Sequence, residues 1–501
     1  MRTVLSLTLA AALLGLSQSS STGGLLITGG TVIDGTGAPG RRVAVRIRGD
    51  EIADVAASLT PEGGEAVIDA SGLIVAPGFI DVHSHADRGV EGSPEALSQV
   101  LQGITTAVVG QDGGGSLPVS SFFETIARVR PAINYATSVG HGSVRSLVLG
   151  GDFRRAATAR EIETMKALVD RGMLDGALGL SSGLEYDPGF YARPEELVEL
   201  ARVAARHGGF YSSHVRDEEN EVFEAWREAI DVGRKAGLPV QISHIKLASK
   251  PVWGRAREAL ALLEQARAEG ITVMADWYPY RYWQSSIYVL IPDRDFENRE
   301  KWETGLAEIG GAGNVLVTGY RHDPAFNGKT IAELASAAGK DPATLIIEMI
   351  RSAGPGIGII GTAMIESDLE TLFPHPQILI SSDGGIAGRH PRGYGAFPRV
   401  LARYVRERRL VPLHEAIAKM TGRSARQVGL TDRGEIVRGR KADIVVFDAA
   451  KIQDLAAPQE PAQTSVGIRH VIVNGERVLE DGALTAARPG RALKPRRATS
   501  R

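Results

Sequence analysis

Cysteine is absent from all 501 residues of the chain. This absence excludes disulfide bonds, thiolate metal ligands and a lipid anchor attached through cysteine. Any bound metal ion must therefore be held by histidine, aspartate or glutamate side chains.

The chain also lacks an excess of charge of either sign, because 57 basic residues oppose 59 acidic ones. A balanced composition gives no indication of a nucleic-acid partner. The length exceeds the usual size of one domain, which predicts one large domain and a smaller one. The 59 glycines predict many tight corners between strands and loops, as in an α/β enzyme.

The apolar run at residues 4–16 is too short to span a bilayer comfortably. It follows Arg2 and precedes small polar residues, a pattern typical of a secretory signal peptide, which we assign to residues 1–21. An uncleaved N-terminal anchor is the alternative. The pattern predicts a secreted or periplasmic protein without a stable membrane anchor.

Short β-rich runs occupy residues 22–75 and return in residues 430–485. Asn474-Gly475 is a strong signal for a type I′ hairpin in the second segment. We expect the two segments to form one small β-sandwich domain built from both chain ends. The Pro-, Arg- and Ala-rich residues 486–501 predict a disordered tail.

Strand-like and helix-like stretches alternate through residues 76–429, and a capping box of Thr158 and Glu161 starts one of the helices. Eight strand-then-helix units predict a TIM (β/α)8 barrel. Residues 281–376 are long for one crossover and contain a strand and a helix of their own, which indicates an insertion that can supply a lid or a substrate pocket. The eight strand-like runs are LIVAPGFIDVH, GITTAVVG, INYATSVGH, DGALGLSS, GGFYSSHV, LPVQISHI, GITVMADWYPY and PQILISSDG.

Polar residues end four of these runs, the first, fifth, sixth and eighth: His83, His85, His214, His244 and Asp383. In a TIM barrel the carboxyl ends of the strands carry the active site. Residues two apart in a strand project to the same face, so that both histidines of the first run can reach one metal ion. Each residue alone could be a capping or hydrogen-bonded group, but together they predict a metal site.

The chain resembles the amidohydrolase superfamily and, within it, the N-acyl-D-amino-acid deacylase (D-aminoacylase) family. The segments HSH and SSDG are typical of the superfamily, whereas SSGLEYDPG, SHIK with YPY, and HPRGYG with FPRVL point to the deacylases. The resemblance implies zinc ligands at His83, His85, His214 and His244, with Asp383 as the general base. Zinc activates a water molecule and polarises the amide carbonyl at such sites.

One position departs from the family pattern. The deacylases have a cysteine ligand after the second strand, where this chain has Asp112. Other superfamily members bridge two metals with a carboxylate or carboxylated lysine at the fourth strand, where Glu185 lies. We expect one or two Zn²⁺ ions and favour Glu185 as the bridging ligand, with Asp112, or neither residue, as the alternatives.

An N-acyl amino acid carries a carboxylate, which an arginine can bind with two parallel hydrogen bonds. Arg392 is the first candidate, and Lys246, Tyr186 and Tyr278 resemble substrate-binding positions of the family. We also expect two residues of the GHGSVR segment to border the pocket, namely His141 and Arg145.

The expected function is metal-dependent hydrolysis of the amide bond of N-acyl amino acids. A preference for the D-form follows from the resemblance alone. Two alternatives stay open: hydrolysis of a cyclic amide or a dipeptide by the same chemistry, and a noncatalytic periplasmic binding protein of the same fold. The expected partner is a small-molecule substrate, and the sequence does not indicate an oligomeric state.

Overall fold

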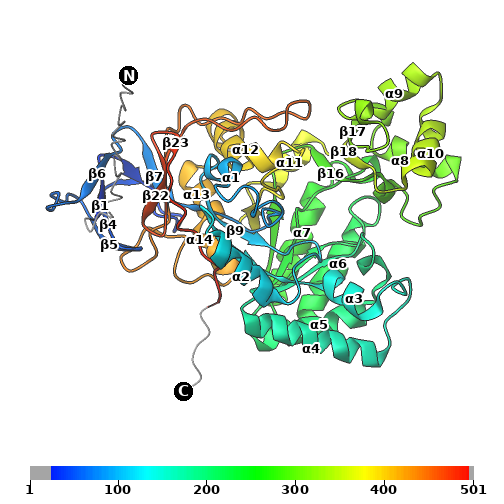
Figure 1. Cartoon of the computed structure of the whole chain (residues 1–501), viewed down its shortest axis with the longest axis horizontal. Coiled ribbons are helices and arrows are strands. Elements are labelled where there is room, and N and C mark those ends of the chain that lie inside the picture. Colours follow the sequence, from blue (N-terminus) through cyan, green and yellow to red (C-terminus); the bar gives the residue numbers. More distant parts are fainter. Residues whose placement is uncertain (1–23, 496–501) are drawn as a thin grey trace, which may run out of the picture.

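The computed structural model describes residues 24–495. The predicted signal peptide and the last six residues lie outside this range. Figure 1 shows three parts in a row: a small β domain, a central barrel with its helices, and an insertion at the opposite end. None of the helices within residues 24–495 has both the length and the apolar character needed to cross a bilayer.

The central part contains parallel strands in two hydrogen-bonded sets. The N–H of Leu178 donates to the Thr137 carbonyl and the N–H of Asp383 donates to the His83 carbonyl, each at 2.9 Å. These bonds join the edges of the two sets and close the TIM barrel. The strands are β8 (Phe79–Asp81), β9 (Ile104–Val109), β10 (Asn134–Thr137), β11 (Val139–Gly140), β12 (Gly179–Gly183), β13 (Phe210–His214), β14 (Val240–Ile242), β15 (Val273–Trp277) and β19 (Ile378–Ile380).

Helices follow the barrel strands and cover the outside of the barrel (Figure 1). The predicted capping box is confirmed, because the Thr158 side chain accepts from the Glu161 N–H and the Glu161 side chain accepts from Thr158. The helices are α1 (Leu97–Val100), α2 (Val119–Val129), α3 (His141–Leu149), α4 (Ala159–Asp175), α5 (Pro194–Arg206), α6 (Val222–Ala236), α7 (Ala256–Ala268), α11 (Glu366–Leu372), α12 (Arg392–Arg399), the π-helical η6 (Val400–Glu407), α13 (Leu413–Met420) and α14 (Gly422–Gln427).

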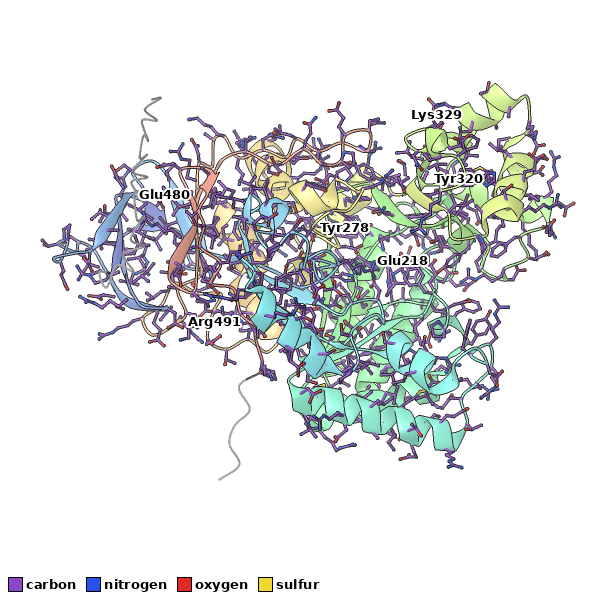
Figure 2. The ribbon with its side chains drawn as sticks, in the orientation of Figure 1. Glu218, Tyr278, Tyr320, Lys329, Glu480 and Arg491 are labelled. Carbon is purple, nitrogen blue, oxygen red and sulfur yellow. The ribbon has the colours of Figure 1, made fainter. Side chains whose placement is uncertain are left out.

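The insertion between β15 and β19 has a three-stranded antiparallel sheet in the order β16-β18-β17. Figure 2 labels Tyr320 and Lys329 in this part, whereas Glu218 and Tyr278 lie nearer the barrel. Its regular elements are β16 (Tyr282–Ser286), η3 (Ile287–Leu290), α8 (Arg299–Glu308), β17 (Val315–Gly319), α9 (Ile331–Ala338), α10 (Pro342–Ala353) and β18 (Gly358–Thr362).

The small β domain combines both chain ends in two sheets, ordered β5-β4-β1-β6 and β23-β22-β21-β20-β7-β2-β3. Buried apolar side chains from both ends share one cluster, with Leu25 and Ile47 beside Ile444 and Ile472. The strands are β1 (Leu25–Thr28), β2 (Thr31–Val32), β3 (Arg41–Arg42), β4 (Ala44–Arg48), β5 (Glu51–Ala56), β6 (Ala66–Asp69), β7 (Ile74–Pro77), β20 (Ile444–Phe447), β21 (Ile468–Val473), β22 (Glu476–Glu480) and β23 (Ala483–Leu484). Asn474 and Gly475 join β21 to β22 with φ of 47° and 83°, as a type I′ turn requires.

The segment 486–495 corrects the prediction of a disordered tail for this part of the chain. The Tyr135 N–H donates to the Arg491 carbonyl at 2.9 Å, and the Leu493 N–H donates to the Tyr135 carbonyl at 2.7 Å. Leu493 is buried among barrel residues. The segment thus pairs with β10, the edge of one strand set. The Pro- and Arg-rich composition hid this role, because the pairing depends on backbone groups and one buried leucine.

Candidate metal centre

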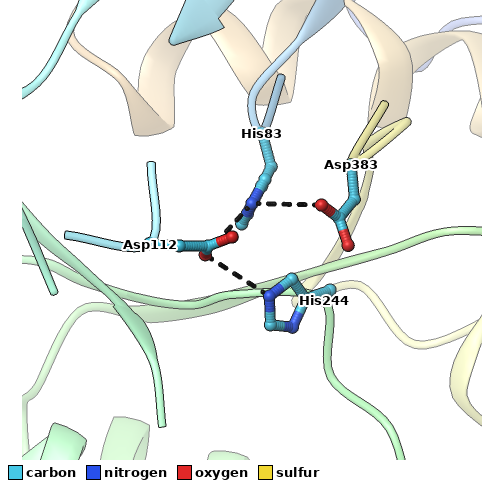
Figure 3. A group of neighbouring side chains, drawn as sticks. All are labelled: His83, Asp112, His244 and Asp383. Atoms are coloured by element: carbon cyan, nitrogen blue, oxygen red, sulfur yellow. Dashed lines mark ion pairs between the residues drawn. The ribbon is translucent and has the colours of Figure 1, made fainter. Parts of the chain in front are cut away.

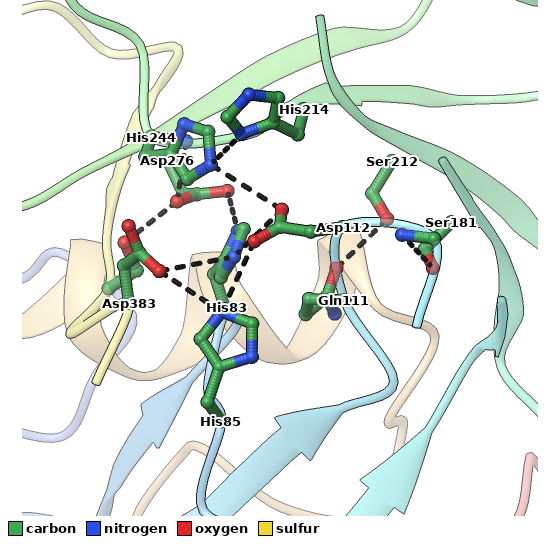
Figure 4. A network of polar contacts seen from close by, with 12 residues as sticks. His83, His85, Gln111, Asp112, Ser181, Ser212, His214, His244, Asp276 and Asp383 are labelled. Carbon is green, nitrogen blue, oxygen red and sulfur yellow. Dashed lines mark hydrogen bonds and ion pairs between the residues drawn. The ribbon is translucent and has the colours of Figure 1, made fainter. Parts of the chain in front are cut away.

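The predicted metal ligands meet at the carboxyl end of the barrel. His214 is the last residue of β13, and His83, His244 and Asp383 follow β8, β14 and β19 by two or three residues. Figure 4 shows their side chains converging with those of His85 and Asp112. Parallel strands end at the same face of the barrel, which is why residues far apart in the sequence meet here.

A compact group of four side chains forms the middle of the site (Figure 3): His83, Asp112, His244 and Asp383. One ligand atom from each lies within 4.8 Å of the others. The Asp112 Oδ1 atom lies 3.3 Å from His83 Nε2 and 3.4 Å from His244 Nε2. The Asp383 Oδ1 atom lies 3.6 Å from His83 Nε2 and 3.2 Å from His85 Nε2.

Several polar atoms of this group are buried and have no hydrogen-bond partner within the described chain: His83 Nε2, Asp112 Oδ1 and Asp383 Oδ1. Unpartnered buried polar atoms are costly, and here they face one another around one point. Imidazole nitrogen and carboxylate oxygen are donors that zinc accepts in sites with no thiolate. The donor set therefore fits a zinc ion.

Three residues of this group have an unusual backbone conformation. Asp112, His244 and Asp383 have φ of 54°, 34° and 49°. Residues other than glycine rarely adopt the left-handed region, and such residues gather at functional sites. The surrounding barrel thus holds each ligand in a conformation that its own sequence does not favour.

The geometry favours Asp112 over Glu185 as the bridging ligand. His214 presents Nδ1 to His244 Nε2 at 2.9 Å, whereas its other nitrogen, Nε2, lies 2.9 Å from Glu185 Oε2. Glu185 thus contacts the side of His214 that faces away from the cluster. Asp112, in contrast, has one oxygen beside both His83 and His244 and its other oxygen 3.2 Å from His85 Nε2.

Lys246, Glu218 and His244 form a second buried group beside the first. The Lys246 ammonium donates to both oxygens of Glu218 at 2.6 and 2.7 Å. His244 Nδ1 lies 3.0 Å from Glu218 Oε1. His214, Glu218 and His244 could also hold a metal ion, but the lysine already neutralises Glu218. Glu218 therefore orients the imidazole of His244 and the ammonium of Lys246.

Asp383 pairs with the predicted carboxylate-binding arginine, because Arg392 Nη1 lies 2.6 Å from its Oδ2 atom. Burial by itself would raise the pKa of Asp383, but the Arg392 guanidinium and neighbouring histidines hold this pKa well below its ordinary value. The carboxyl group is therefore ionised at neutral pH. Arg392 Nε remains without a partner among the described residues.

A cavity of about 700 Å³ opens over the metal cluster. Glu185, Tyr186, Lys246 and Arg392 line it together with the ligands. Tyr278 lies behind this wall, with its ring 5.9 Å from Lys246 Nζ and 4.9 Å from the Arg392 guanidinium carbon. The predicted substrate residues Arg392, Lys246 and Tyr186 thus line the cavity, and Tyr278 lies close to the two cations.

Two further residues of the site, Asp276 and His390, were not predicted from the sequence. Asp276, near the end of β15, accepts from the His244 N–H at 2.9 Å, and its Oδ2 atom lies 3.5 Å from His83 Nδ1. His390 Nδ1 accepts from the Arg392 N–H at 3.0 Å. A signal for Asp276 was present, because it is a charged residue inside the apolar seventh strand run. His390 follows no strand directly, so a rule based on strand ends could not find it.

His141 and Arg145 do not line this cavity, which corrects the expectation that they border it. Both are fully buried on α3. His141 Nε2 lies 2.8 Å from Glu196 Oε1, and Arg145 pairs with the other oxygen of Glu196. Arg145 also donates to the Pro188 carbonyl at 3.0 Å. These residues tie α3 to α5 and to the loop after β12.

Comparison with known proteins agrees with this geometry. A sequence model of the Amidohydrolase family matches residues 66–479. The chain is 36% identical to a D-aminoacylase from Alcaligenes xylosoxydans xylosoxydans, over 94% of this chain and 97% of that protein.

Two solved structures are similar over 94% of this chain and 99% of their own. One is a D-aminoacylase with a binuclear metal center, for which one-metal activation and second-metal attenuation are described, at 36% identity and a TM-score of 0.84. The other is an N-acyl-D-glutamate deacylase from Bordetella Bronchiseptica with zinc and a phosphonate inhibitor that mimics the tetrahedral intermediate, at 37% identity and a TM-score of 0.83.

Proposed function

Since this chain belongs to the amidohydrolase family, we propose that it hydrolyses N-acyl-D-amino acids to a carboxylate and a free D-amino acid with zinc as cofactor. The observation that carries the proposal is the set of unpartnered buried atoms of His83, Asp112 and Asp383 beside the cations Lys246 and Arg392 in one cavity. A metal-binding cluster and a carboxylate-binding pair are the two parts that this substrate needs.

His83, His85 and Asp383 would hold one zinc ion, His214 and His244 a second, and Asp112 would lie between the two. When bound, zinc supplies Lewis-acid polarisation of the scissile carbonyl and lowers the pKa of water. Two divalent cations repel each other, so an anion between them is required in a two-metal site. Asp112 meets this requirement because its oxygens face ligands of both groups.

Asp383 acts as the general acid and base. Its ionised carboxylate takes a proton from the attacking water and delivers it to the nitrogen of the departing amino acid. Arg392 keeps this carboxylate ionised and fixes its Oδ2 atom. The Oδ1 atom faces His83 and His85, which is the side on which the attacking water would lie.

Lys246 and Arg392 bind the carboxylate of the substrate. Lys246 is held in place by Glu218, and the ring of Tyr278 lies near both cations. Arg392 also lines the cavity. Two fixed cations on one side of the cluster orient the amino-acid part of the substrate before the amide bond is attacked.

The test is a substrate screen with purified protein. We expect zinc-dependent hydrolysis of the N-acetyl-D forms of Leu, Met, Glu or Asp, with the N-acetyl-L forms, dipeptides and cyclic imides hydrolysed more slowly. Chelation should abolish the activity and zinc should restore it. Undiminished activity in metal-free protein, or a preference for the L-forms, would contradict the proposal.

Arg392→Lys provides a sharper test of carboxylate binding. We expect KM for the N-acyl-D-amino acid to rise by about tenfold, because the lysine ammonium cannot form the two parallel hydrogen bonds that the planar arginine guanidinium forms with a carboxylate. KM for the corresponding amide, which has no carboxylate, should change little, while kcat should fall for both because Asp383 loses its partner. Arg389→Lys is the matched control, since Arg389 is exposed and does not line the cavity. Equal KM effects on both substrates would assign Arg392 a structural role.

We also propose that the protein is exported. The support is the pattern in residues 1–21, where one arginine precedes an apolar run and small residues follow. Expression of the full chain in a bacterium should yield mature protein in the periplasm or medium, with an N-terminus near residue 22 by mass spectrometry. Uncleaved protein in the cytoplasm would contradict export.

A further inference from the structure

A second hollow lies beside the metal centre. It is a groove of about 570 Å³, and it shares two lining residues, Asp112 and Tyr186, with the main cavity. The rest of its wall comes from the loop after β9, from α3 and from the loop after β12. The groove and the main cavity therefore meet at the bridging carboxylate.

The two hollows differ in charge. The main cavity is lined by three cations, Arg88, Lys246 and Arg392, as well as by acidic residues, whereas the wall of the groove, all of it within residues 24–495, contains no lysine or arginine. Its apolar members are Leu117, Leu147 and Pro188, together with five glycines, and its charged members, Asp112 and Asp187, are both acidic. A carboxylate is therefore favoured beside Lys246 and Arg392 in the main cavity and disfavoured in the groove, which has no cation, while an uncharged apolar group suits the groove.

An N-acyl amino acid likewise has a charged part and an apolar part. The carboxylate lies on the nitrogen side of the scissile bond, and the acyl chain lies on the carbonyl side. When Lys246 and Arg392 hold the carboxylate and the metal cluster holds the scissile carbonyl, the acyl chain points away from the two cations. We propose that the groove binds the acyl chain of the substrate and determines which chain lengths the enzyme accepts. This inference rests on the proposed deacylase function.

An exposed apolar wall supports this role. The side chain of Leu147 on α3 is 64% exposed although it faces the groove. Leu147 would lose this exposure beneath an alkyl chain. Each methylene group that the groove buries fully would improve binding by about fourfold at most.

The glycines of the groove fall into two groups. A Cβ atom at Gly183 would lie 2.2 Å from the Asp112 carbonyl oxygen, so this glycine is needed for close backbone packing. A Cβ atom at Gly114 would meet only the Gln111 carbonyl oxygen, at 3.4 Å, which is an ordinary contact. Gly114 can therefore carry a side chain that narrows the groove, and so can the exposed Ser146 on α3.

The test compares Gly114→Leu and Ser146→Trp with the wild type on N-acetyl, N-butyryl and N-octanoyl derivatives of one D-amino acid. We expect wild-type kcat/KM to hold or rise with chain length. Both variants should lose about tenfold or more in kcat/KM for the octanoyl substrate and about twofold or less for the acetyl substrate. Calorimetry with the inactive Asp383→Asn protein should show the same selective loss in affinity for the octanoyl substrate.

Ser336→Trp is the matched control, because Ser336 is also an exposed helical serine and α9 lines neither hollow. It should leave the chain-length profile unchanged. Equal losses for acetyl and octanoyl substrates in the groove variants, no loss for either, or a wild-type rate that falls steeply with chain length would overturn the inference. A wild type that hydrolyses no N-acyl amino acid would instead overturn the proposed function itself.

Discussion

Two buried clusters of histidine and carboxylate side chains differ in how many of their polar atoms have hydrogen-bond partners. In the cluster around His83 and Asp383, several ligand atoms have no partner within residues 24–495. In the cluster around Arg145 and Glu196, the arginine bonds to the carboxylate and to three backbone carbonyls. Only the Nδ1 atom of His141 lacks a partner there.

This difference distinguishes a ligand-binding site, the cluster around His83, from a cluster that stabilises the fold, the one around Arg145. In a folded chain, most buried polar atoms form hydrogen bonds with other groups of the chain. Those without such a partner are tolerated where a bound ligand supplies the interaction. Strand-end position alone does not distinguish the two, because His141 also follows a barrel strand directly. Substitutions in the first cluster should therefore change metal binding and turnover, and substitutions in the second should change stability.

The largest effect is expected for Asp383→Asn. It removes the proton acceptor, so kcat should fall by about 10³-fold. Glu196→Gln, in the other cluster, should leave kcat within about threefold of the wild type. Steady-state kinetics on zinc-loaded protein measures both, and near wild-type turnover in Asp383→Asn would remove its assigned role.

The next prediction concerns the bridging carboxylate. Asp112→Asn should lower the zinc content from about two ions per chain toward one, because the remaining ligands no longer place an anion between the metals. Glu185→Gln should keep both ions, since Glu185 contacts only the outward nitrogen of His214. Metal analysis after dialysis measures the contents. Loss of zinc in Glu185→Gln but not in Asp112→Asn would restore the original assignment.

The structural cluster should respond in stability instead of activity. Glu196→Gln leaves the buried Arg145 without a counter-charge and should lower the free energy of unfolding by roughly 3 kcal/mol. The double variant Arg145→Met with Glu196→Gln should lose less, because no buried charge is left unpaired. Denaturant unfolding of the zinc-loaded proteins measures this. A double variant that is less stable than Glu196→Gln would show that packing, not charge, dominates.

The last prediction depends on pH and concerns Lys419, a buried residue of α13 that bonds to the carbonyl oxygens of His375 and Ile378. Burial lowers the pKa of Lys419 to about 7 in the folded protein, so the unfolded chain binds more protons between about pH 7 and 10. Stability therefore rises with pH across this window, by at most about 1.4 kcal/mol per pH unit. Between pH 7 and 9.5, the Tm of the wild type should rise relative to the Tm of Lys419→Met. A constant Tm difference would show that Lys419 keeps its ordinary pKa.

Much of the site could be predicted because strand ends in a barrel share one face. Polar residues after apolar runs identified His83, His214, His244 and Asp383, and the structure brings them together. Asp276 lies inside the seventh run and not at its end, so this rule did not identify it. The barrel itself followed from the alternation of strand and helix patterns.

The remaining features depend on backbone geometry that a sequence does not display. Asp112 and Glu185 both follow strands, and the left-handed backbone of Asp112 is a feature that the sequence does not reveal. The burial of His141 depends on α5, which supplies its partner Glu196. The pairing of residues 490–493 with Tyr135 joins segments more than 350 positions apart and uses no side-chain pattern.

The central claim is that the unpartnered atoms around His83 hold zinc. Anomalous diffraction at the zinc absorption edge, from crystals grown with zinc, tests it most directly. We expect a zinc peak about 2.0–2.2 Å from His83 Nε2 and from a carboxylate oxygen of Asp112 or Asp383. Absence of zinc at this cluster, or zinc bound only between His214, Glu185 and Glu218, would contradict the account.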